Sequence, residues 1–399
     1  MTENQPLHPL LDRIQRPALI VGGTGILLCI VGLLINTHHR EQFFRSWLLA
    51  YLFWLGIPLG SFAILMLQHL AGGGWGLVLR RPLETAARTL PLMALLFIPL
   101  FFGLGKLYIW ATDDAARGVG TTSLRAHYLT SGFFIVRTII YFILWIGLAM
   151  VLNRWSTRED RGADPRLTRR FQILSSIGLV VYCLTMTFAT IDWVMSLDPH
   201  WYSTIFGLLF IVGQVLSSLA LMTALLALLS TRPPLSAIVT ADHFHDLGNL
   251  LLAFTMLWAY MQFSQFLIIW SGNIADETPF YIYRTHRGWQ VVGLLLIIFH
   301  FFIPFILLLN RRTKRTPHIL AMVGLAIVVM RLVDLFWIIV PHHAQGRHLE
   351  ISHPIVHWLD IAAIAGIGGI WIWWFIFQLR RTALVAVNDP RLAEVTAHA

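Results

Sequence analysis

The sequence predicts an all-α polytopic membrane protein. Of its 399 residues, 57% are hydrophobic and only 12% are charged, whereas soluble domains carry about 25% charged residues. The mean hydropathy is +0.69. The apolar residues form long runs instead of segments of about 10 residues with alternating polarity, which argues against a membrane β-barrel.

Ten of these runs are long enough to cross a bilayer, because about 20 apolar residues span its hydrocarbon core. The expected spans are residues 18–35, 43–71, 85–108, 128–153, 171–196, 200–230, 246–271, 289–310, 318–340 and 355–380. Only short connections separate them, so we expect one membrane domain over residues 1–399. The first run follows a polar start and lacks a small-residue cleavage site, so no removable signal is expected.

The charges of the loops predict the orientation of the chain. With ten spans both termini share a side, and the loops and tails of that side carry 18 Lys and Arg against 7 on the other side. The positive-inside rule then places both termini in the cytoplasm. The net charge of +9 is explained by basic residues beside apolar spans, so we expect membrane lipids and no nucleic acid as partners.

The connection between the fifth and sixth spans is the most informative stretch. Asp192 stands near the end of the fifth span, and an acid inside the hydrocarbon edge is a candidate functional residue. Asp198-Pro199 is typical of a helix start, with Asp as N-cap and Pro at the first helical position. We therefore expect a very short connection, flanked by Trp193 and Trp201 as interfacial aromatic residues.

Polar residues recur in steps of three and four along the fifth span. Tyr182, Thr185 and Ser196 belong to this stripe together with Asp192. Two interpretations stay open: a hydrated path that leads to Asp192, or hydrogen bonds between helices. Arg137, about nine residues into the fourth span, should meet a carboxylate or a carbonyl in the bundle interior. A permanent pair with Asp192 would be structural, and our preferred reading is instead an Asp192 that faces water and exchanges protons.

Two further spans carry charges at helical spacing. Arg331 and Asp334 are three residues apart and can pair on one face. His353, His357 and Asp360 are expected to share a face of the tenth helix, where a carboxylate one turn from an imidazole would fix its tautomer for a proton relay.

The remaining candidates stand alone. His300 lies near the middle of its span, and single histidines at different depths argue against haem, which needs two axial ligands on facing helices. Lys106 lies near a span end and can snorkel to the interface. The candidates for a proton path or for buried ion pairs are Asp192, Arg137, Tyr182, Thr185, Ser196, Arg331, Asp334, His357, Asp360, His300 and Lys106.

Cysteine usage limits the redox chemistry of the chain. Cys29 and Cys183 both lie within spans, and no Cys-x-x-Cys occurs. The sequence therefore gives no support for an iron–sulfur centre, a thiolate zinc site or a disulfide framework.

Four segments carry a resemblance to a known family. They are FFIVR at 133–137, IDWVMSLDPHW at 191–201, and DLGNL at 246–250 with WAYMQFSQ at 258–265. Together they resemble the ActF subunit of bacterial alternative complex III, which is similar to the NrfD/PsrC-type integral membrane proteins. The resemblance extends over essentially all ten spans. It implies two four-helix bundles, residues 43–196 and 200–340, with peripheral helices at 18–35 and 355–380.

The resemblance also implies a function in the bacterial cytoplasmic membrane. Such complexes oxidise quinol and pass electrons to a cytochrome c or a terminal oxidase. The implied partners are a sister NrfD-like quinol-binding subunit, an iron–sulfur subunit and multihaem cytochrome c subunits. Quinol or menaquinol, haem c and iron–sulfur clusters then belong to those partners, and this chain, which binds no cofactor itself, supports assembly and proton conduction.

Three alternative functions remain open. The chain could itself bind quinol, with His357 and Asp360 as proton acceptors. It could work as a stand-alone proton-coupled transporter. It could also be a purely structural subunit, which charge-neutralising variants that assemble normally would distinguish from a proton-conducting one.

Overall fold

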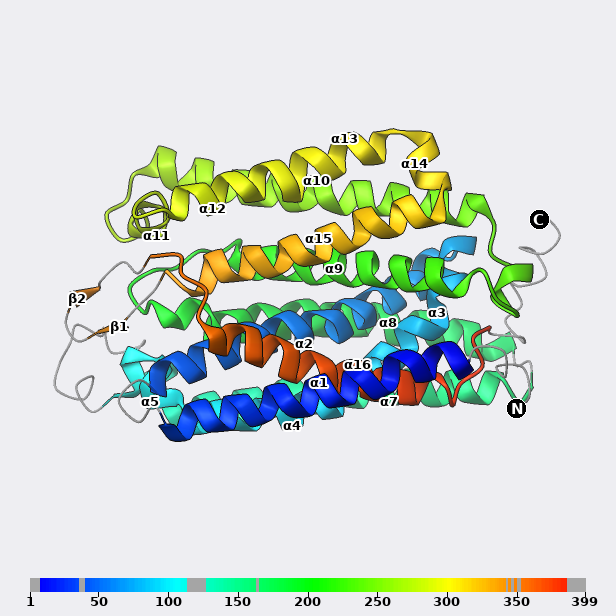
Figure 1. Ribbon diagram of the computed structural model, residues 1–399, viewed down its shortest axis with the longest axis horizontal. Coiled ribbons are helices and arrows are strands. Elements are labelled where there is room, and N and C mark those ends of the chain that lie inside the picture. Colours follow the sequence, from blue (N-terminus) through cyan, green and yellow to red (C-terminus); the bar gives the residue numbers. More distant parts are fainter. Residues whose placement is uncertain are drawn as a thin grey trace.

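A computed structural model of the chain describes residues 8–35, 40–112, 127–162, 165–341, 344–345, 348–349 and 353–385. Within this part, ten helices are long and apolar enough to cross a membrane, which confirms the all-α polytopic class. Their axes are roughly aligned with the long axis of the molecule (Figure 1).

Eight of the described spans are single long helices, and the other two consist of consecutive helical segments. They are α1 (His8–Ile35), α2 (Arg40–Ala71), α3 (Gly74–Ala87) with α4 (Leu90–Phe102), α7 (Ser131–Glu159), α8 (Pro165–Trp193), α9 (Phe206–Leu229), α10 (Ala241–Gly272), α12 (Trp289–Leu295) with a π-helical turn (Leu296–Phe302) and α13 (Ile303–Leu309), α15 (Pro317–Ile339) and α16 (Trp358–Leu379). The shorter elements are α5 (Leu104–Leu107), α11 (Pro279–Arg284), α14 (Arg311–Arg315), the 3₁₀ turns Ile109–Ala111, Met195–Leu197 and Leu235–Ala237, and the antiparallel strands β1 (Ala344–Gln345) and β2 (His348–Leu349).

The third span begins at Gly74, well before the expected residue 85. Gly72 and Gly73 have positive φ values of 69° and 93°, which lets the chain reverse directly after α2. The segment that follows is polar, so hydropathy alone assigned Arg80 and Arg81 to a loop. In the structure both arginines are buried in α3, where carboxylates compensate their charge.

The expected short connection between the fifth and sixth spans is wrong. The helix that follows begins at Phe206 instead of near Asp198. Asp198 does accept a hydrogen bond from the backbone of His200, 3.2 Å away, as an N-cap residue would. This contact closes a local turn instead of opening a helix, and the chain remains irregular up to Ile205.

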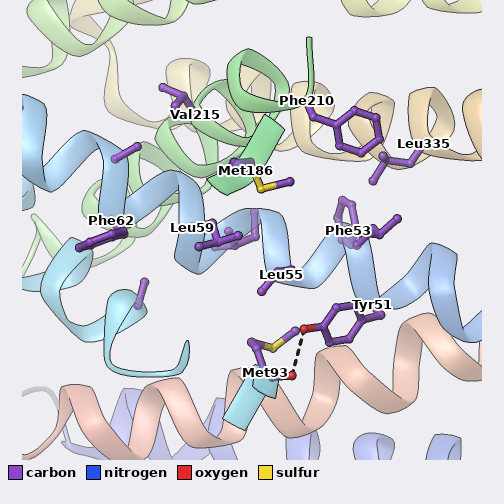
Figure 2. Close-up of a cluster of buried hydrophobic side chains, with 14 of the residues drawn as sticks. Tyr51, Phe53, Leu55, Leu59, Phe62, Met93, Met186, Phe210, Val215 and Leu335 are labelled. Carbon is purple, nitrogen blue, oxygen red and sulfur yellow. Dashed lines mark hydrogen bonds between the residues drawn. The ribbon is translucent and has the colours of Figure 1, made fainter. Parts of the chain in front are cut away.

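The helices α2 and α9 form the centre of the molecule. In their apolar windows 94% and 83% of the residues are buried, more than in any other described span. The two helices pack against each other, α2 also packs against α3, α8 and α16, and α9 packs against α8, α10 and α15. Figure 2 shows Leu59 of α2 near Met186 of α8, and Leu55 of α2 on the side toward Met93 of α4, in this core.

Glycine allows the two central backbones to approach closely. A Cβ atom at Gly60 would lie 2.1 Å from the carbonyl oxygen of Gln214 on α9, which no side chain tolerates. Next to this contact, Ser61 and Ser218 hydrogen-bond at 2.7 Å. Small residues and hydroxyls are the usual means of joining helices in lipid.

The first and last helices pack along each other. Glycines at both crossing surfaces, such as Gly25 and Gly366, leave no room for a Cβ atom. At one end of this pair Arg380 forms an ion pair with Asp12, so α1 begins and α16 ends at the same end of the molecule (Figure 1). The assignment of that end to the cytoplasm, and the division into two four-helix bundles, stay predictions.

Candidate functional site

Arg137 of α7 and Asp192 of α8 form a buried, two-pronged ion pair. The Nε and Nη2 groups of Arg137 donate to the two carboxylate oxygens of Asp192 at 2.9 and 2.8 Å. The hydroxyl of Tyr141 donates to the same carboxylate at 2.8 Å. Asp192 is fully buried and Arg137 is 7% exposed, so the expectation that Arg137 meets a carboxylate matches the geometry.

The surroundings of Arg137 hold its guanidinium in place. Its third nitrogen, Nη1, donates to the backbone carbonyl of Tyr128 at 3.0 Å. The guanidinium carbon lies 3.9 Å from the ring centroid of Tyr128 and 4.3 Å from that of Phe133, distances at which cation–π attraction operates. Burial raises the pKa of Tyr128 to about 12, and this phenol therefore keeps its proton at neutral pH.

This geometry corrects the preferred reading of Asp192 as a residue that faces water. Both of its oxygens accept hydrogen bonds from fixed donors, an arrangement that holds the carboxylate in one orientation. The pair therefore matches the structural alternative.

The other residues of the polar stripe make hydrogen bonds to separate partners, two of them on neighbouring helices and one within the same segment. Tyr182 donates to Gln214 of α9 at 2.7 Å. Thr185 accepts a hydrogen bond from the indole of Trp145 on α7 at 2.8 Å. Ser196 donates to the backbone carbonyl of Asp192. Each contact fits the interpretation of the stripe as polar contacts within and between helices.

A second cluster lies between α10, the π-helical turn and α15. Arg331 pairs with Asp334 as the spacing predicted. The carboxylate of Asp334 also accepts from the Trp258 indole and from the Gln262 amide, each at 3.3 Å. Gly213 of α9 makes room for this cluster, because a Cβ atom there would lie 2.3 Å from the Arg331 guanidinium carbon.

His300 is the histidine of this second cluster. It is fully buried, and its ring centroid lies 4.0 Å from that of Trp258. The Met330 backbone lies near the ring, but neither ring nitrogen makes a hydrogen bond of standard geometry within the described part of the chain. His300 stands on a π-helical turn, a distortion that often marks functional positions.

The expected relay of His353, His357 and Asp360 on one helix face is wrong. The tenth span starts at Trp358, so His357 is its N-cap and His353 lies outside the helix. Asp360 accepts from the backbone N–H of His357 at 2.8 Å, and the His357 ring accepts from the backbone N–H of Leu359 at 3.2 Å. The two side chains satisfy the free N–H groups of a helix start, and neither fixes the tautomer of the other.

Asp360 also joins this helix start to α2. Its second oxygen accepts from the hydroxyl of Ser46 and from the amide of Gln42. Lys106 of α5 lies apart from all these clusters and is exposed, as expected for a side chain that snorkels.

Sequence reasoning missed the largest charged cluster. Arg80, Arg81 and Glu84 of α3 are each 1% exposed. Glu84 pairs with both arginines at 3.0 Å, Arg80 also pairs with Glu159 of α7, and Arg81 pairs with Asp160. The signal was present as opposite charges at i,i+3 and i,i+4 within a segment that looked like a loop.

Together the fold and these clusters define a polytopic helical membrane protein with several buried ion pairs. In the part of the chain that the structure describes, no three His, Cys, Asp or Glu side chains are placed to hold a metal ion. Comparison with known proteins adds no family assignment: no protein-family model and no curated protein matches the chain.

Proposed function

We propose that the chain is a membrane subunit of a respiratory quinol oxidoreductase of the alternative complex III type, and that it carries no redox centre of its own. The observation that carries this proposal is the placement of two motif segments of the resemblance. Residues 133–137 and 191–201 are far apart in the sequence, and they meet in one buried ion pair between Arg137 and Asp192.

The ion pairs support a role as a rigid scaffold. Breaking a buried pair costs about 3–5 kcal/mol, so charges shared between helices resist changes in helix position. The Arg137–Asp192 pair joins α7 to α8, and the Arg80–Glu159 pair joins α3 to α7. Partner subunits that carry the haems and iron–sulfur clusters would dock on a membrane frame held in this way.

A proton-conducting role would use the second cluster. In this proposal His300 is the group that carries the proton. Its ring centroid lies 4.0 Å from that of Trp258, which donates to the Asp334 carboxylate. Asp192 is less suited to this role, since both of its oxygens are engaged by fixed donors. Quinol binding at His357 and Asp360 is likewise less favoured, because both side chains cap α16.

Purification of the tagged chain from its native membrane in a mild detergent tests the proposal. We expect co-purification with iron–sulfur and multihaem cytochrome c polypeptides, visible as haem absorbance and as quinol-dependent cytochrome c reduction. A homogeneous 45.4 kDa polypeptide without partners would contradict the proposal. Proton-coupled transport by that single chain in vesicles would favour the transporter alternative.

The proton role has a separate test in the assembled complex. His300→Phe keeps an aromatic ring beside Trp258 but removes the titratable group. We expect normal subunit content, near-normal quinol oxidation in uncoupled membranes and a lower proton-to-electron ratio. His69→Phe is the matched control, since His69 is a buried histidine that contacts Ser175. An unchanged ratio in a fully assembled His300→Phe complex would remove His300 from any proton path.

A further inference from the structure

A groove of about 970 Å³ opens beside α7 at the end of the molecule where α1 begins and α16 ends. The C-terminal half of α7 forms one wall, the junction of α3 and α4 forms another, and Gln378 of α16 contributes at the end. The Gln378 amide donates to the backbone carbonyl of Arg88 at 3.3 Å, which fixes this corner. The groove belongs to none of the buried ion-pair clusters.

The outer half of the groove is basic. Arg154 and Arg158 of α7, and Arg161 just beyond its end, line it together with Arg88, whose Nε donates to Asn153 at 2.7 Å. Arg154, Arg158 and Arg161 are exposed, and their side chains form no ion pair within the described residues. No acidic side chain lines the groove.

The acids nearest to Arg158 and Arg161 in the sequence form ion pairs with arginines of α3. Glu159 and Asp160 stand between Arg158 and Arg161 in the sequence, but they pair with Arg80 and Arg81 of α3. The acids of this segment thus lie in ion pairs with α3, whereas its arginines line the groove. The groove keeps an excess of positive charge.

The inner half of the groove is apolar. Ile146 and Met150 of α7 and Pro91 of α4 line it. It continues into the apolar surface of the same helices, where Ile143 of α7 is 63% exposed and Leu95 of α4 is 61% exposed. In a membrane protein such a surface faces acyl chains.

The length of the groove matches one leaflet of a bilayer. Ile146 and Arg158 are twelve residues apart on α7, which corresponds to about 18 Å at 1.5 Å per residue, and Arg161 lies just beyond the end of this helix. Half of a bilayer with its headgroups measures about 20–22 Å. The apolar half therefore lies at the depth of acyl chains, and the arginines lie at the depth of phosphate groups.

We propose that this groove is a binding site for an anionic phospholipid. The arginines would bind the phosphate of the headgroup, for which planar, multiply donating guanidinium groups are well suited. The apolar half would hold an acyl chain. Basic pockets between membrane helices bind anionic headgroups in this way. The proposal does not depend on the respiratory function proposed above.

Lipid titration of the purified full chain in a mild detergent, followed by native mass spectrometry, tests this site. The probes are phosphatidylglycerol, cardiolipin and phosphatidylcholine with matched acyl chains. We expect the two anionic lipids to bind at least tenfold more tightly than phosphatidylcholine. The variant R154Q/R158Q/R161Q should lose this preference at least tenfold, while its exposed substitution sites leave the fold unchanged.

The control variant R169Q/R170Q/R311Q removes the same number of positive charges from exposed positions outside the groove. It should change anionic lipid binding less than twofold. Equal loss in both variants would overturn the proposal, because bulk charge would then explain the preference. Acyl-free glycerophosphoglycerol separates a lipid from a free phosphate ligand: if it binds as tightly as the complete lipid, the site recognises phosphate alone and the lipid proposal fails.

Discussion

Arg137 and Asp192 are stable inside the membrane because each compensates the other. A single ionised side chain in hydrocarbon is expensive, whereas two parallel hydrogen bonds within the pair satisfy both charges. Tyr141 and the Tyr128 carbonyl take up further hydrogen-bonding capacity of the pair. At the scale of the residue, a polar atom in this protein is therefore tolerated where a neighbouring helix supplies its partner.

Arg137→Gln should destabilise the chain by about 3–5 kcal/mol, because it leaves the Asp192 carboxylate buried without its cation. Asp192→Asn leaves Arg137 uncompensated and should also destabilise. The double variant should be less destabilised than the sum of the two single variants, since no unpaired charge remains. Reversible unfolding of the purified chain in SDS measures this cycle. A loss below about 1 kcal/mol for Arg137→Gln would show that the pair is not structurally important.

At the scale of the element, capped helix ends and close helix contacts determine how the helices are placed relative to one another. The N-terminus of α16 is closed by His357 and Asp360, and Asp360 also binds α2 through Ser46. The central contact between α2 and α9 depends on the absence of a side chain at Gly60. Both features place a helix relative to α2, which is the most buried span.

The cap of α16 predicts a pH dependence. The His357 ring accepts a hydrogen bond, so only its neutral form caps the helix, and burial lowers the pKa of His357 below its usual range. Between that lowered pKa and about 6.5, the unfolded chain binds more protons than the folded chain. The contribution of His357 to stability is therefore complete above about pH 6.5 and declines as the pH falls.

His357→Asn provides the test of this pH dependence, since Asn caps helices well and does not titrate. Unfolding free energies measured from pH 7.5 to pH 5 should fall less steeply for the variant than for the wild type. Identical slopes would show that His357 does not contribute to the pH dependence.

Gly60→Ala tests the central helix contact. The added methyl group would meet the Gln214 carbonyl, and overpacking of this kind costs about 1–3 kcal/mol. Gly147→Ala on α7 is the matched control, because no atom lies within 4 Å of a Cβ atom there. The control should be neutral or slightly stabilising, as expected from helix propensity. Equal stabilities of the two variants would contradict the close α2–α9 contact.

At the scale of the whole molecule, charge is distributed unevenly between the two ends. The end that holds the start of α1 and the end of α16 also holds the basic groove beside α7. This distribution agrees with the positive-inside rule. With the predicted orientation, the proposed lipid site faces the cytoplasmic leaflet, which carries the most anionic lipid.

Cysteine labelling with a membrane-impermeant thiol reagent checks this orientation. His200→Cys should react in intact cells, and Thr231→Cys at the opposite end should react only after permeabilisation. Both replaced positions are exposed, and the native Cys29 and Cys183 lie within spans. Labelling of position 200 from the cytoplasmic side alone would reverse the predicted topology.

The sequence by itself determined the ten spans, because a bilayer demands about 20 apolar residues in a row and each helix satisfies its own backbone. It also predicted the pairing of Arg331 with Asp334, since both stand on one turn of one helix. Rules based on neighbouring residues gave wrong predictions where the hydrogen-bond or ion-pair partner is distant in the sequence. Asp360 caps its own helix and also binds Ser46, and Arg80 and Arg81 are buried within the helix bundle because Glu84, Glu159 and Asp160 pair with them.

Only the tertiary structure decided what Asp192 does. The sequence places an acid near a span end and an arginine in the preceding span, and it leaves open whether the acid faces water or the arginine. That choice depends on how α7 and α8 rotate against each other, which is set by contacts such as Trp145 with Thr185. Hydropathy and residue spacing describe a single helix, whereas the partner of a buried charge depends on how two helices pack against each other.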